Sequence, residues 1–114
     1  MSVASAVLSV PLALALAVTG IGKLLRLEPA VQQVEAVGVT GRAITILGLL
    51  EIAAAVALIA GIWFQPLGVA GAIGSTLYFT GAVVAHIRAR DPQPQAAIAL
   101  LLLSGVALVP LILP

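Results

Sequence analysis

The 114-residue sequence contains no cysteine and very few charged residues. Without cysteine it cannot form disulfides, use a thiolate nucleophile, hold an iron–sulfur cluster through thiolates or carry a Cys-x-x-Cys redox relay. Charged residues make up 8% of the chain and hydrophobic residues 62%, against soluble averages of about 25% and about 45–50%. The composition therefore excludes a soluble globule, and any redox role needs an external cofactor or partner.

Three further classes of function lack the residues they need. The formal net charge is +1 and no basic run is present, which argues against nucleic-acid binding. A single histidine and one carboxylate inside an apolar stretch cannot complete a metal site, and no second histidine is present for haem. No nucleophile, base and acid follow the Ser/His/Asp pattern. The sequence thus has no self-contained catalytic motif, and whether the protein is an enzyme stays open.

What the chain does contain is long apolar stretches. About 20 apolar residues cross a hydrocarbon core about 30 Å thick. The first stretch has no positive n-region and no evident cleavage site, so we interpret it as a retained span. Glu28-Pro29 is typical of a helix start, and Pro92 and Pro94 separate the last two stretches. We predict a single all-α domain over 1–114, a transmembrane four-helix bundle with a short interfacial helix at about 29–37 and spans at about 3–22, 43–62, 67–86 and 95–113.

The positive charges predict an orientation in the cell membrane. All five Lys and Arg residues fall in the two loops 23–42 and 87–94. Because loops rich in Lys and Arg stay in the cytoplasm, we expect both of these loops inside the cell and both termini outside.

Glu51 is the one charge in the middle of a span. At a helix centre an acidic residue costs about 2.5–3.5 kcal/mol on the insertion scale, so it normally faces the bundle interior and has a partner. At about 1.5 Å per residue, Glu51 lies roughly 12 Å from the start of its span. Lys23 can reach back to this depth, and Tyr78 or Thr80 can donate a hydrogen bond to the carboxylate. Thr19 lies at a matching depth in the first span.

Each of these residues also has a structural interpretation. Glu51 is either a clasp that holds helices in register or part of a site. Lys23 is either its partner or a snorkelling residue that sets topology. His86 is either an interfacial residue or a ligand-contacting, proton-exchanging group, since its ordinary pKa is about 6.5. Arg88 fits a topology determinant best and is a secondary site candidate with Thr19 and Thr80.

Three short motifs, in this order and spacing, resemble the DoxX-like family of small bacterial four-span membrane proteins. They are Gly20-x-Gly22-Lys23-Leu24, Leu47-Gly48-x-x-Glu51-Ile52 with Gly61-x-Trp63, and Gly81-Ala82-x-x-x-His86-x-Arg88.

The resemblance implies a four-helix bundle in the bacterial inner membrane and supports Lys23, Glu51 and His86 as the positions to examine. The family takes its name from a subunit associated with thiosulfate:quinone oxidoreductase and a terminal oxidase, and related proteins are tied to redox or oxidative-stress partners. Thiosulfate chemistry is not carried over, because this chain has no cysteine and little mass outside the predicted spans.

The leading hypothesis is an accessory subunit that binds a lipophilic small molecule, with a quinone as candidate, and serves a membrane redox partner. The pocket would be lined by Lys23, Glu51, Tyr78 and His86, with Lys23 or His86 donating to a carbonyl and Glu51 orienting the donor or relaying a proton. One alternative is a small proton-coupled transporter acting as a homo-oligomer, with Glu51 as its proton-binding group. Another is a purely structural assembly subunit.

Overall fold

The computed structural model describes residues 2–91 and 94–113, and every regular element in that part of the chain is a helix. Four of these helices are long and one is short, which confirms the predicted all-α class. Pro92, and with it the middle of the predicted 87–94 loop, lies outside the described residues. The helices are α1 (Val3–Leu24), α2 (Glu28–Glu35), α3 (Arg42–Ala60), α4 (Gln65–Arg88) and α5 (Gln95–Ile112).

The four long helices α1, α3, α4 and α5 are candidate membrane spans of 22, 19, 24 and 18 residues. The molecule is 40 Å long in its greatest dimension, close to the roughly 40–45 Å of a bilayer with its headgroups. The predicted ends agree with the observed ones to within two residues at each terminus of each span. The described helices therefore match a bilayer in length and in composition.

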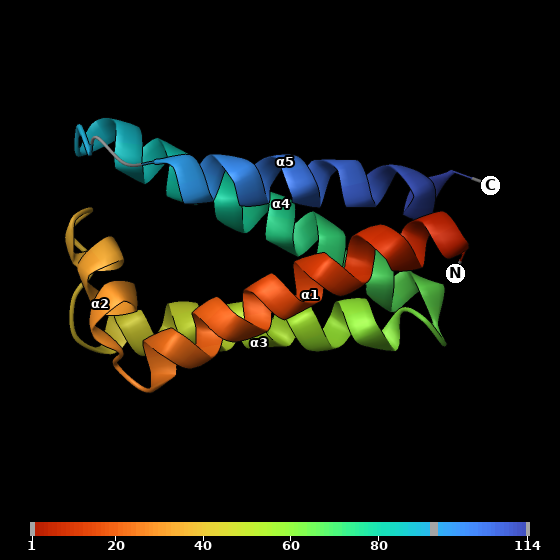
Figure 1. Cartoon of the computed structure of the whole chain (residues 1–114), viewed down its shortest axis with the longest axis horizontal. Helices are drawn as coiled ribbons and strands as arrows, with labels where there is room; N and C mark the ends of the chain where they lie inside the picture. Colours follow the sequence, from red (N-terminus) through yellow and green to blue (C-terminus); the bar gives the residue numbers. More distant parts are fainter. Residues whose placement is uncertain (1, 92–93, 114) are drawn as a thin grey trace.

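The long helices form a ring in which each packs against two others (Figure 1). Helix α3 packs against α1 and α4, and α5 packs against α4 and α1. Figure 1 shows both chain ends at one end of the bundle, while α2 lies at the other end, near the end of α4 and the start of α5. We call this second end the loop-side end.

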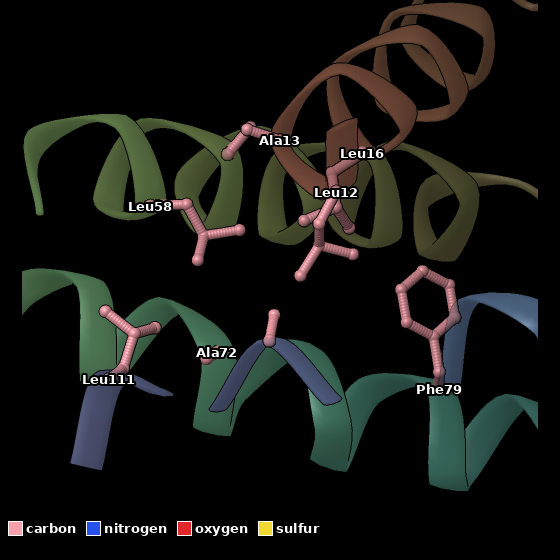
Figure 2. Close-up of a cluster of buried hydrophobic side chains, with 9 residues drawn as sticks. Leu12, Ala13, Leu16, Leu58, Ala72, Phe79 and Leu111 are labelled. Atoms are coloured by element: carbon pink, nitrogen blue, oxygen red, sulfur yellow. The ribbon is translucent and has the colours of Figure 1, made fainter. Parts of the chain in front are cut away.

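Leucines and small residues fill the half of the bundle nearest the termini. Leu12 and Leu16 of α1, Leu58 of α3 and Leu111 of α5 are at most 1% exposed. Figure 2 shows these side chains pointing into the space between the α1–α3 and α4–α5 pairs, together with Phe79 of α4. This cluster forms the apolar core between the two helix pairs of the bundle.

Candidate functional site

Glu51 is the centre of a buried polar cluster built by three helices. Its Oε1 atom accepts hydrogen bonds from Nζ of Lys23 on α1 and, at 3.0 Å, from the hydroxyl of Tyr78 on α4. Its Oε2 atom accepts from the hydroxyl of Thr19. Glu51 is 1% exposed and Lys23 5% exposed. The lysine neutralises the carboxylate, and the two hydroxyls supply the further hydrogen bonds that a buried ion pair needs.

Helical spacing explains why these side chains meet. Thr19 and Lys23 are four residues apart on α1, so they lie one turn apart on the same face. Where α1 packs across α3, Thr19 bonds to Oε2 of Glu51 and Lys23 bonds to Oε1. Tyr78 completes the cluster because α3 also packs against α4.

The structure decides between the two hydroxyl donors considered on α4, in favour of Tyr78. Thr80 is exposed, and its hydroxyl donates instead to the backbone oxygen of Thr76, at 2.7 Å. Two helical residues turn the side chain through about 200°, so Thr80 points away from the face that carries Tyr78. Arg88 is likewise exposed, at the end of α4, and does not line the site.

A cavity of about 360 Å³ lies beside the cluster in the loop-side half of the bundle. Lys23, Glu51, Tyr78 and His86 all line it, with Thr19. The other lining residues are mostly alanine, valine and leucine from α2, α3, α4 and α5 and from the segment after α2. Ligand sites commonly have this character, an apolar enclosure with a few convergent polar groups.

His86 provides a second polar position in the cavity. It is 4% exposed, and its Nδ1 atom lies 2.6 Å from Oδ2 of Asp91. A Nδ1–H that donates to this carboxylate leaves Nε2 as a hydrogen-bond acceptor. Nε2 has no hydrogen-bond partner within residues 2–91 and 94–113. A ligand hydroxyl can therefore donate to it.

The sequence did not indicate Asp91 as the partner of His86. The backbone brings the two together at the end of α4, where Arg90 adopts a φ of 54° and the Asp91 N–H donates to the His86 oxygen at 3.0 Å. This is a Schellman-type helix end, which usually has glycine in the left-handed position. Because an arginine takes that position here, no glycine in the sequence marks the motif.

The role of α2 was also not fully predicted. We expected an interfacial helix, but α2 additionally turns Val34 and Gln33 toward the cavity, and Val34 is 8% exposed. A Cβ at Gly22 would lie 3.4 Å from the Cβ of Ala30, so α2 packs closely on the end of α1. The spacing of Val31, Val34 and Val37 was the signal for this apolar face.

A polar vestibule of about 480 Å³ adjoins the cavity on its loop side. Gln33 and Ala96 line both spaces, while Asp91 lines only the vestibule. The His86–Asp91 hydrogen bond therefore connects a residue of the cavity to a residue of the vestibule.

Among the described residues no three His, Cys, Asp or Glu side chains lie close enough to hold a metal ion.

Comparison with known proteins places the chain by family. The model of the DoxX-like family matches residues 7–109, a range that includes the whole polar cluster and the cavity-lining His86. No curated protein and no solved structure matches the chain. The match spans nearly all of the sequence, so the chain is a multi-pass membrane protein that belongs to the DoxX-like family.

Proposed function

We propose that this protein binds a lipophilic small molecule with a polar ring, of the quinone type, in the loop-side cavity and serves a membrane redox partner. The observation that carries the proposal is the cavity itself: an apolar space of about 360 Å³ lined by the Glu51 cluster and His86. A merely structural ion pair has no need of an adjoining cavity.

The polar groups suit the two opposite oxygens of a quinone or quinol. At one position Lys23 gives one of its three N–H groups to Glu51 and keeps others for a ligand carbonyl, while the Tyr78 hydroxyl, whose proton goes to Glu51, can accept from a ligand hydroxyl. At the other, Nε2 of His86 accepts from a hydroxyl, or donates to a carbonyl when the ring is protonated. The site can thus bind both the hydroxyl and the carbonyl form of such a ring. The cofactor chemistry itself would belong to the ligand and the partner.

Binding of tetramethylbenzoquinone, which has no tail, to the protein in lipid nanodiscs tests the proposal. A Cβ added at Gly81, on the cavity wall, or at Gly105, which lines none of the cavities described, meets no heavy atom within 4 Å. Gly81→Leu therefore adds a large side chain on the cavity wall at a position where its Cβ has room, and Gly105→Leu is a matched control. We expect binding by the wild type and by Gly105→Leu, and its loss in Gly81→Leu. Absence of binding to the wild type would overturn the proposal.

A proton-coupled carrier is the second candidate. Glu51 lines the loop-side cavity and also a second cavity nearer the termini, between α3 and α4. A carboxylate between two such spaces suits a group that binds a proton from either side. Proteoliposome proton flux that Glu51→Gln abolishes would favour this function, and flux that this substitution leaves unchanged would argue against it.

A further inference from the structure

The second cavity, of about 500 Å³, begins where the first one ends. Glu51, Leu77 and Tyr78 line both cavities. The two spaces are therefore adjacent across this boundary, one extending toward the loop-side end and one toward the termini. We call the second space the α3–α4 groove.

The α3–α4 groove opens toward the lipid. At its rim Leu50 and Leu77 are 53% and 69% exposed on the outside of the two spans. Half of its lining residues are alanine or glycine, and at Gly71 an added Cβ would lie 3.0 Å from the Leu58 nitrogen. Close helix contact of this kind needs small residues. The groove is therefore narrow at its floor and open at its rim.

The polar atoms of the α3–α4 groove are already bonded within the protein. The Ser75 hydroxyl donates to the Gly71 oxygen at 2.7 Å, and the Tyr78 hydroxyl donates to Glu51. Both oxygens of Glu51 accept from residues of the cluster. A polar headgroup would gain little here, whereas a hydrocarbon chain would contact apolar walls.

We propose that the α3–α4 groove holds the hydrocarbon tail of the molecule whose ring occupies the loop-side cavity. This inference rests on the proposed function and narrows its ligand class to a ring-headed amphiphile with one long chain. The ring lies beyond Tyr78, near His86, and the chain passes Leu77 into the groove and toward the bilayer. The ligand then enters from the lipid, between α3 and α4.

Gly74 lines the groove and is a suitable position for a larger side chain. A Cβ at Gly74 meets no heavy atom within 4 Å, as at Gly105, so Gly74→Leu adds bulk on the groove wall at a position where its Cβ has room. Two quinones are compared in nanodiscs, tetramethylbenzoquinone and a benzoquinone with a decyl tail. We expect Gly74→Leu to weaken binding of the tailed quinone by about tenfold, since the chain loses its contacts, and to leave the tail-less quinone unaffected. Gly105→Leu should bind both as the wild type does.

Each other outcome has a distinct meaning. Equal binding of the tailed quinone by Gly74→Leu and Gly105→Leu would overturn the inference while the proposed function stands, because the tail then makes no contact with the groove. Equal weakening of both quinones in Gly74→Leu would also overturn it. A change of oligomeric state in Gly74→Leu alone would assign the groove to a second copy of the chain. A wild type that binds neither quinone would remove the proposed function as well.

Discussion

Gly20 of α1 and Gly48 of α3 lie in backbone contact at the crossing of the two helices. A Cβ added at Gly20 would lie 2.9 Å from the Gly48 oxygen, and a Cβ at Gly48 would lie 2.9 Å from the Gly20 oxygen. Gly20 follows Thr19 directly in the sequence, and Gly48 lies about one helical turn before Glu51. Thr19 and Glu51 are both members of the polar cluster. The close crossing is what allows the side chains of α1 to reach the carboxylate on α3.

Gly20→Ala should therefore separate the helices and destabilise the protein by about 1–3 kcal/mol, the usual cost of overpacking. Unfolding by denaturant in detergent measures the effect. Gly105→Ala is the control, and it should be neutral or slightly stabilising, because alanine favours a helix over glycine and no atom lies within 4 Å of the new Cβ. Equal stability of the two variants would contradict the close crossing.

Glu51→Gln should destabilise the protein by about 3–5 kcal/mol, because it leaves the buried Lys23 ammonium without a counter-charge. The double variant Lys23→Met/Glu51→Gln removes both charges and should recover most of that stability. The same unfolding assay measures the wild type, Glu51→Gln, Lys23→Met and the double variant. A double variant that is less stable than either single variant would show that the two residues do not act as a pair.

Tyr78→Phe should cost about 1.5–3 kcal/mol, because the hydroxyl donates to a charged acceptor. It should also weaken binding of tetramethylbenzoquinone, because Glu51, which holds the Lys23 donor in place, loses one of its hydrogen bonds. Thr80→Val is the matched control, since the Thr80 hydroxyl bonds only to its own helix backbone among the described residues. If Thr80→Val instead reduced quinone binding as much as Tyr78→Phe, our placement of the site on the Tyr78 face of α4 would fail.

His86 is the only histidine in the chain, so ¹⁵N-histidine labelling of protein purified without a histidine tag gives the signals of one imidazole. We expect the neutral ring to carry its proton on Nδ1, since this atom faces the Asp91 carboxylate. Asp91→Asn should shift the population toward the other tautomer. Finding the wild-type proton on Nε2 would contradict the proposed acceptor role of that atom.

The absence of cysteine makes orientation directly measurable. Single cysteines at Glu35, after the first span, and at Phe64, between the second and third, lie at exposed positions. With the charged loops in the cytoplasm, a membrane-impermeant maleimide added to intact cells should label Phe64→Cys and spare Glu35→Cys. The reverse labelling pattern would show the opposite orientation.

The sequence predicts those features that a bilayer imposes. Four spans follow from apolar length, and the partners of Glu51 follow from depth, since few polar residues lie within reach of it. Asp91 and the inward face of α2 depend instead on backbone turns at Arg26 and Arg90, where non-glycine residues take positive φ. Residue type does not indicate such turns. Cavities likewise depend on how side chains from several helices pack, which no single segment specifies.

The most direct test of the proposed binding site is to identify the small molecules that copurify with the protein from its native membrane. Wild type and Gly105→Leu are purified in parallel with Gly81→Leu, and the organic extract of each is examined by mass spectrometry. We predict a ring-headed lipophile that copurifies with the wild type and Gly105→Leu in near-equal amount to protein and is depleted from Gly81→Leu. Extracts that contain only bulk phospholipid, the same for all three proteins, would contradict the central claim that this cavity is a binding site.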